Sequence, residues 1–175
     1  MKGRSEQTVA YRVYHNGSDL LGVATIEAPQ IQFLTETLAG SGIAGEIENP
    51  TIGMSQSLAV KFTFNSPMPA QFDTIDWNKA ALYECYGALQ VSDDATGMRD
   101  SVPVRMNILG RPKSFPLGTW EQGKKHGNEV EMEVTRLEYL LDGEEKLLID
   151  KLNFIYRVNG SDLMQKIRQQ TGMNI

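Results

Sequence analysis

NEVEMEVTRLEYLLDGEEKLLIDKLNFIY, residues 128–156, contains the two longest strand candidates of the chain. Residues 128–141 alternate apolar and polar side chains with the two-residue period of a β-strand, and residues 146–158 form the second candidate. Asp142-Gly143 lies between them, and Asp-Gly is a preferred turn of β-hairpins. The stretch therefore predicts two long antiparallel strands joined by a tight turn.

The alternation in this stretch slips once. It holds through Val134, but Leu137, Tyr139 and Leu141 are apolar at odd-numbered positions, where the preceding residues are glutamates. A β-bulge or a strong twist near residues 135–136 accounts for the slip. We expect the strand to be acidic on one face in its first half and buried on both faces in its second half.

Three glutamates share one face of the first half. Glu129, Glu131 and Glu133 are two residues apart, which places them about 6.7 Å from one another along a strand. In water the repulsion between neighbours is only about 0.6 kcal/mol, and salt screens it further. A solvated sheet face therefore accounts for the three like charges without any further function.

The composition is that of an ordinary globular protein. The 175 residues suit a single domain over residues 1–175, with 41% hydrophobic and 22% charged residues. The net charge of −5 argues against attraction to nucleic-acid phosphates. Cys85 is the only cysteine and cannot form an internal disulfide. With no signal-peptide pattern and no 18-residue apolar run, we expect a cytosolic subunit without a membrane span.

Shorter alternating segments predict more strands. They cover residues 8–14, 20–26, 59–64, 102–109 and 113–117. Asn16-Gly17 predicts a hairpin turn between the first two. Pro103, Pro112 and Pro116 would confine parts of the last two to sheet edges or bends.

Two segments have a helical pattern. Residues 73–86 begin with Asp73 as a possible N-cap, end at Gly87, and would pack a stripe of apolar residues on a sheet: Trp77, Ala81 and Cys85. Residues 161–171 predict a short C-terminal helix that begins at Ser161 or Asp162. The pentapeptide NGSDL occurs at 16–20 and 159–163, and we interpret the first copy as a hairpin turn and the second as a helix start. The fold class is mainly β, an antiparallel sandwich or barrel with one packed helix and a short C-terminal helix.

Residues 36–54 are rich in glycine, lack any period and predict a long flexible loop. They contain Gly40-Ser41-Gly42-Ile43-Ala44-Gly45, a literal G-x-G-x-x-G, but no helix pattern follows, as dinucleotide binding would require. Residues 118–125, GTWEQGKK, resemble a phosphate loop but carry a lysine where Ser or Thr must hold magnesium. Both nucleotide motifs are therefore rejected.

No residue pattern predicts catalysis, a metal or a cofactor. His15 and His126 lie in predicted turns and are expected to be surface residues. Neither has the spacing to Cys85 of a zinc site, and Cys85 itself is interpreted as a small core residue. We therefore expect a protein that is not an enzyme.

Two blocks of sequence carry a family likeness. VYHNGSDLLGVATIEAP (13–29) and EYLLDGEEKLLIDKLNFIYRVNGSDLMQKIR (138–168), in this order and at this distance, resemble the major tail tube proteins of contractile-tailed bacteriophages. The AGSGIAG loop and the AVKFTF strand fall where that family has equivalents. The likeness spans nearly the whole chain and is weakest over residues 65–128.

The resemblance implies a structural subunit with the tail-tube fold. Such subunits form hexameric rings that stack into a hollow tube inside a contractile sheath, within the virion tail, after synthesis in the host bacterial cytoplasm. The implied partners are further copies of the chain, the sheath protein, and tape-measure and baseplate or initiator proteins. DNA would pass through the bore during ejection without specific binding.

The resemblance also suggests site residues. Glu129, Glu131 and Glu133 are the candidates for lining the bore, because an acidic wall repels phosphates. Contacts between subunits or rings are expected from the glycine-rich loop, at Gly40, Gly42, Ile43, Gly45, Ile47 and Ile52. Two alternatives remain: a tube protein of a type VI secretion-like system, and a monomeric ligand-binding β-barrel.

Overall fold

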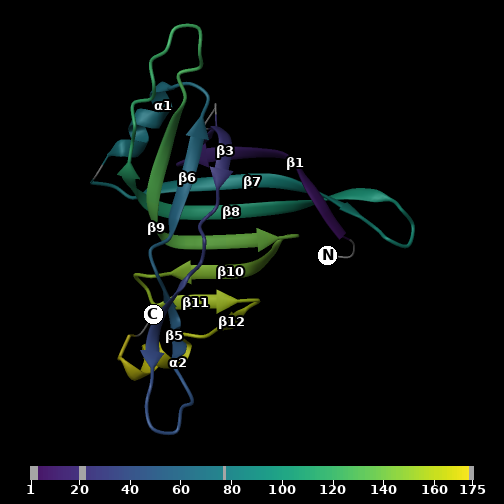
Figure 1. Cartoon of the computed structure of the whole chain (residues 1–175). Helices are drawn as coiled ribbons and strands as arrows, with labels where there is room; N and C mark the ends of the chain where they lie inside the picture. Colours follow the sequence, from purple (N-terminus) through teal and green to yellow (C-terminus); the bar gives the residue numbers. More distant parts are fainter. Residues whose placement is uncertain (1–3, 20–22, 77, 174–175) are drawn as a thin grey trace.

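The computed structural model describes residues 4–19, 23–76 and 78–173 and is dominated by an antiparallel sheet of ten strands (Figure 1). The strands of this sheet are β1 (Arg4–His15), β2 (Ser18–Asp19), β3 (Val23–Glu27), β6 (Ala59–Phe64), β7 (Ala81–Ser92), β8 (Arg99–Ser114), β9 (Asn128–Leu141), β10 (Glu144–Asp150), β11 (Ile155–Val158) and β12 (Ser161–Asp162). A separate hairpin pairs β4 (Phe33–Leu38) with β5 (Ile47–Ser55). The helical segments are α1 (Pro69–Phe72), the 3-10 turn η1 (Asp73–Ile75) and α2 (Gln165–Gln170). The predicted mainly antiparallel β class is confirmed.

Strand β9 belongs to two layers because it changes partners halfway. Its first half pairs with β6, its second half pairs with β10, and β8 runs alongside both. Val134 pairs with Gly110 of β8, and Arg136 pairs with the preceding Leu109. Thr135 is thus an extra residue, and its Oγ1 donates a hydrogen bond of 3.1 Å to the Leu109 carbonyl. The predicted bulge is confirmed, and it turns β9 from one layer into the other.

The second half of β9 differs from its prediction. Leu137 is buried, but residues 138–141 are all half-buried. Glu138 and Leu140 alternate with Leu137 and therefore lie on the outer face of the long sheet, next to side chains of the neighbouring strand β8. The prediction that the second half of β9 is buried on both faces is therefore wrong.

The core lies between the layer of β3, β6 and the first half of β9 and the layer of β1, β7, β8 and β10. Phe62 of β6 and Tyr83 of β7 stack across this space with ring centroids 4.8 Å apart. Residues with essentially no exposure surround them: Leu58, Val60, Ile108, Met132 and Val134. Each such side chain stabilises the fold by about 1.5–3 kcal/mol relative to an exposed one.

The helix predicted over residues 73–86 is wrong. The chain makes only the short α1 and η1 and then enters β7 at Ala81, while Trp77 lies outside the described residues. Ala81 and Cys85 do face the core, but through two-residue alternation with Tyr83 between them. Gly87 is no helix stop either, because it lies within β7 and a Cβ there would come 2.8 Å from Val104 Cγ1. Pairing with β1 and β8 on both sides outweighs the helical propensity of the segment.

The prolines of β8 do not confine it to an edge, contrary to the sequence expectation. The strand is continuous from Arg99 to Ser114 between β7 and β9. The Pro103 carbonyl accepts from Asp142 N, so the position of its missing N–H also faces the β9 side of β8. Asp142 comes after Leu141, the last β9 residue that pairs with β8. Pro112 lies past the end of β7 and next to a register shift. Both prolines therefore sit where the ladder needs no donor.

The C-terminal part contains two more hairpins than predicted. Residues 146–158 are not one strand, because the chain turns after Asp150 and β11 pairs back on β10. The Asp150 carboxylate holds this turn by accepting from Asn153 N and Nδ2 at 3.1 and 2.8 Å. The second NGSDL copy is a hairpin turn like the first: both have Asn-Gly at positive φ, followed by a two-residue strand. The last helix accordingly begins only at Gln165.

We expect Gly110→Ala to destabilise the protein strongly, because Gly110 faces the bulge. A Cβ at this position would lie 2.4 Å from the Glu133 carbonyl oxygen, and backbone cannot move as a flexible side chain can. The free energy of unfolding should fall by about 2 kcal/mol or more, measured by urea denaturation. The control is Gly40→Ala, where no atom lies within 4 Å. Equal stability of the two variants would contradict the tight packing at the bulge.

Asp162 gives the fold an acid-sensitive contact. The Arg168 guanidinium donates to its carboxylate at 2.7 Å and holds the pKa of Asp162 below its usual value. A lowered folded-state pKa contributes stability above the unfolded-state pKa of about 4, and this contribution is lost as pH falls through the folded-state value. Asp162→Asn should lower the unfolding free energy at pH 7 by about 1–3 kcal/mol, since Arg168 stays buried. It should also flatten the stability profile below pH of about 4, whereas the exposed Asp94→Asn should change neither.

Candidate functional site

The three glutamates of β9 lie on the outer face of the layer that β6 and β9 form, and each has a lysine partner there. Glu129 pairs with Lys61 at 3.3 Å and Glu131 with Lys113 at 2.9 Å. Glu133 is 3.6 Å from the ammonium group of Lys151. These lysines come from other parts of the chain, so the local sequence did not reveal them. The face is acidic in β9 alone but ion-paired once the strands assemble.

The glycine-rich segment is a hairpin rather than a long loop. Residues 36–54 lie mostly in β4 and β5, and only residues 39–46 connect the two strands. Gly42 and Gly45 have φ of 97° and 115°, which favours glycine. Of the predicted contact residues, Gly40, Gly42, Ile43 and Gly45 lie in the connection, and Ile47 and Ile52 lie in β5. The prediction of a flexible loop over the whole segment is wrong.

This β4–β5 hairpin projects from the main sheet beside α2 and exposes apolar side chains (Figure 1). Its large exposed hydrophobic residues are Phe33, Leu34, Leu38, Ile43, Ile47, Ile52 and Met54. Within the described residues its anchoring contacts lie at the base, where Gly53 approaches Met164 so closely that a Cβ would lie 2.2 Å from its sulfur. Lys151 Nζ donates to the Gln56 carbonyl at 2.7 Å on the same side. A fixed base and an apolar outer part suit a contact with another protein surface.

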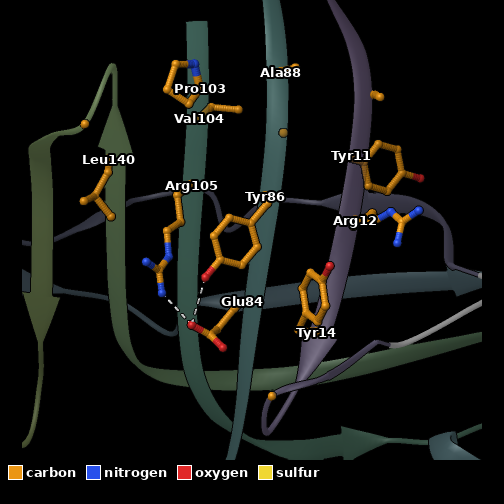
Figure 2. A pocket seen from close by; sticks show the side chains of 14 residues that line it. Tyr11, Arg12, Tyr14, Glu84, Tyr86, Ala88, Pro103, Val104, Arg105 and Leu140 are labelled. Carbon is orange, nitrogen blue, oxygen red and sulfur yellow. Dashed lines mark hydrogen bonds and ion pairs between the residues drawn. The ribbon is translucent and has the colours of Figure 1, made fainter.

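A groove of about 940 Å³ crosses the outer face of β1, β7 and β8 (Figure 2). Figure 2 shows Arg105 of β8 and Tyr86 of β7 pointing toward Glu84, which also lies on β7. Arg105 Nη2 donates to Glu84 Oε1 at 2.5 Å, and the Tyr86 hydroxyl donates to the same oxygen at 3.3 Å. The Arg105 guanidinium lies 4.7 Å from the centre of the Tyr86 ring, and Tyr14 meets that ring edge-on at 5.6 Å. Asn107 of β8 extends this cluster, because it accepts from Arg105 Nε and donates to Glu138 of β9. The cluster therefore links side chains of four strands, β1, β7, β8 and β9.

Sequence reasoning missed this groove because it placed Glu84 and Tyr86 on a helix. The signal that could have found it is the alternation of β7, in which Leu82, Glu84 and Tyr86 share the face opposite the buried residues. Their neighbours on β8 follow only from the strand register, where Tyr86 pairs with Arg105. In this arrangement the Glu84 carboxylate, the Arg105 guanidinium and the Tyr86 ring bind one another.

The cysteine and one of the two histidines are buried in the packed part of the subunit. Cys85 is buried on β7, which confirms its role as a core residue, and burial raises the pKa of its thiol to about 12. His15 is also buried, 8% exposed, so the prediction of a surface residue is wrong; burial lowers its pKa, and the Asp73 charge opposes this. Among the described residues, no three His, Cys, Asp or Glu side chains gather as metal ligands would. In the same part of the chain no helix is both long and apolar enough to cross a membrane.

Arg105→Met tests how much the groove cluster stabilises the fold. Without the guanidinium, the Glu84 carboxylate stays partly shielded from water, and the unfolding free energy should fall by about 1 kcal/mol in urea denaturation. The matched control is Lys146→Met, whose partner Glu144 has a side chain 74% exposed and should contribute little. Equal losses in the two variants would mean that the cluster adds nothing beyond a surface ion pair.

Comparison with known proteins gives a family match over nearly the whole chain. The model of the family described as phage tail tube protein FII matches residues 6–172. A curated relative, the tail tube protein of Escherichia phage P2, is 26% identical over 168 residues, which cover 92% of this chain and 94% of the relative.

Solved structures share the fold at low identity. A chain of the sheath–tube complex of the extracellular contractile injection system PVC, in its extended state, superposes with a TM-score of 0.53 at 14% identity, over 74% of this chain and 87% of that one. A chain of the PVC sheath/tube terminator gives 0.52 at 13%, over 75% and 94%. A chain of the anti-feeding prophage cap gives 0.52 at 11%, over 74% and 87%.

Proposed function

Because the chain belongs to the phage tail tube protein FII family, we propose that its copies close into hexameric rings and that these rings stack into the hollow inner tube of a contractile tail. The chain is a structural subunit of a phage tail tube and a component of the virion tail. The family is one of structural proteins, and we assign the chain no catalytic role and no cofactor. Residues 1–175 act as one tail tube domain in this proposal.

The β4–β5 hairpin is the observation that carries the proposal. A two-stranded hairpin is marginally stable alone in water, and this one pairs with no third strand in the described chain. It nevertheless exposes Leu38, Ile47 and Ile52 by 44%, 52% and 64%. A second copy of the chain that covers these side chains would remove them from water, at about 25 cal/mol per Å² of apolar area. The predicted contact residues of this segment thus keep their assignment, as parts of a hairpin.

The sheet edges also support assembly into rings. Residues 4–10 of β1 pair with β7 on one side, and within the described residues no strand pairs with them on the other side. In the smaller layer, β3 pairs with β6 alone, within the described residues. Unpaired edges invite pairing with another chain, and a heterologous contact repeated around an axis closes a ring without leaving edges.

Glu129, Glu131 and Glu133 remain the proposed lining of the bore. With each glutamate bound to a lysine, the wall would be weakly charged rather than strongly repulsive, and the bound lysines would be less available to DNA phosphates. DNA would then pass without being held. A density map of the assembled tube that places these glutamates against the sheath, or between subunits, would overturn this assignment.

The proposed partners follow from the role of a tube inside a contractile tail. They are the sheath protein around it, the tape-measure protein within it, and the baseplate or initiator proteins on which it begins. Chains of similar fold occur in a sheath–tube complex and in a tube-terminating cap, which supports these partners. No observation favours the two alternatives, a type VI-like tube or a monomeric ligand-binding barrel. In the barrel case the inter-sheet space would have to hold a ligand, and Phe62 and Tyr83 already fill it.

Shortening the hairpin tests the proposal directly. Leu38 pairs with Ile47, so deleting residues 40–45 leaves Ala39-Glu46 as a two-residue turn, which Ala39→Asn and Glu46→Gly would adapt to a type I′ geometry. We expect a folded monomer with native circular dichroism that forms no tubes by negative-stain electron microscopy. The control is Met98→Ala, which removes a side chain 72% exposed at the turn between β7 and β8 and should assemble like the wild type. Normal tubes from the deletion variant would rule out residues 40–45 of the hairpin as an assembly contact.

A further inference from the structure

The connection between β8 and β9, residues 115–127, lies at the opposite end of the molecule from the tip of the β4–β5 hairpin (Figure 1). This Trp120 loop, as we name it, exposes 86% of Trp120 and 68% of Leu117. Tryptophan is among the residues most enriched in the binding centres of protein interfaces, and one left so exposed needs an explanation. The stability of the subunit does not explain this tryptophan, because an exposed indole contributes little to the core.

The Trp120 loop is folded and holds its indole outward. His126 Nε2 lies 2.8 Å from the Leu117 carbonyl oxygen, and its ring meets the Trp120 ring edge-on with centroids 4.6 Å apart. Gly118 has a φ of 86°, and a Cβ there would lie 2.7 Å from His126 Nε2. The histidine thus packs into space that only a glycine leaves open. A side chain supported in this way loses little conformational entropy when it binds a partner.

The two ends of the molecule carry opposite charge. Residues 33–55 contain Glu36, Glu46 and Glu48 and no Lys or Arg, which is a charge of −3. Residues 115–127 contain Lys124 and Lys125 against Glu121, which is a net charge of +1. Lys124 binds Glu121 at 2.7 Å within the loop, and Lys125 Nζ lies 3.4 Å from Asn65 Oδ1. Both ends combine exposed apolar side chains with a net charge, negative on the hairpin and positive on the loop.

We propose that the Trp120 loop of one subunit contacts the β4–β5 hairpin of a second copy in the next ring. This inference rests on the proposed stacking of rings and names the surface that receives the hairpin. Trp120 and Leu117 would cover the apolar residues of the hairpin, and Lys124 and Lys125 would face its glutamates. Because the contact is heterologous, each ring leaves a free hairpin end and a free loop end, so stacking continues along the axis.

The same charges set the polarity of the tube. Hairpin-to-hairpin contact would bring three glutamates against three others, and loop-to-loop contact would bring lysines together. Like charges in an interface disfavour the wrong partner more than opposite charges strengthen the right one. Only head-to-tail stacking, with the loop of every ring facing the hairpin of its neighbour, brings opposite charges together.

Reciprocal charge reversal tests the contact. One variant carries Lys124→Glu and Lys125→Glu, and the other carries Glu46→Lys and Glu48→Lys. Each variant alone should form rings but lose at least tenfold in tube length by negative-stain electron microscopy at low salt. Mixed in equal amounts, the two should form tubes again, because each reversed end then meets its complement in the other variant. Normal tubes from both single variants, or no recovery on mixing, would overturn the proposal.

Trp120→Ala separates the apolar anchor from the charges. We expect rings without long tubes, at every salt concentration, with an unchanged melting temperature since the indole is solvent-exposed in the subunit. The control is Met98→Ala, which removes a side chain 72% exposed at the turn between β7 and β8 and should assemble normally. Wild-type-length tubes from Trp120→Ala would remove Trp120 from the contact. Wild-type protein that forms neither rings nor tubes would instead contradict the proposed function itself.

Discussion

The extra residue at Thr135 is the constraint on which the rest of the structure depends. A regular β9 would keep one face toward one layer along all fourteen residues. With the bulge, the strand turns, so its first half closes the small layer with β6 and its second half extends the long sheet toward β10. Gly110 makes room for the turn, because any larger residue would meet the Glu133 carbonyl. The core between the layers exists because one strand serves both.

The interior of this subunit is packed, so its surfaces are what it offers to other molecules. The inter-sheet space is filled by aromatic and aliphatic side chains, and the one thiol is buried, which raises its pKa. The exposed surfaces that we propose as contacts are an acidic apolar hairpin at one end, a loop of net positive charge with an exposed tryptophan at the other, and sheet edges between them. Such directional surfaces suit the proposed role, in which copies of the chain repeat along an axis.

Sequence patterns predicted the elements whose information is local. The β9 strand, its bulge and the Asp142-Gly143 turn follow from alternation, from its slip and from a dipeptide that accepts positive φ. The predictions failed where neighbouring strands or packed side chains determine the conformation or the burial of a residue. Residues 81–86 have helix-compatible composition, yet β1 and β8 on either side make them a strand. The second NGSDL copy appeared to begin a helix, but its Asn-Gly turn returns the chain onto β11. His15 was expected in water and is covered by packing against Tyr83.

The sequence by itself determined the mainly β class, the family resemblance, and the acidic alternation of Glu129, Glu131 and Glu133. It could do so because side-chain alternation has a range of two residues and turn dipeptides act on their own backbone. Only the tertiary structure decided that Lys61, Lys113 and Lys151 neutralise that stripe, and that Glu84, Tyr86 and Arg105 meet in one groove. It alone placed the hairpin and the Trp120 loop at opposite ends. Such juxtapositions depend on strand register across many residues of chain, and no local pattern records which strands become neighbours.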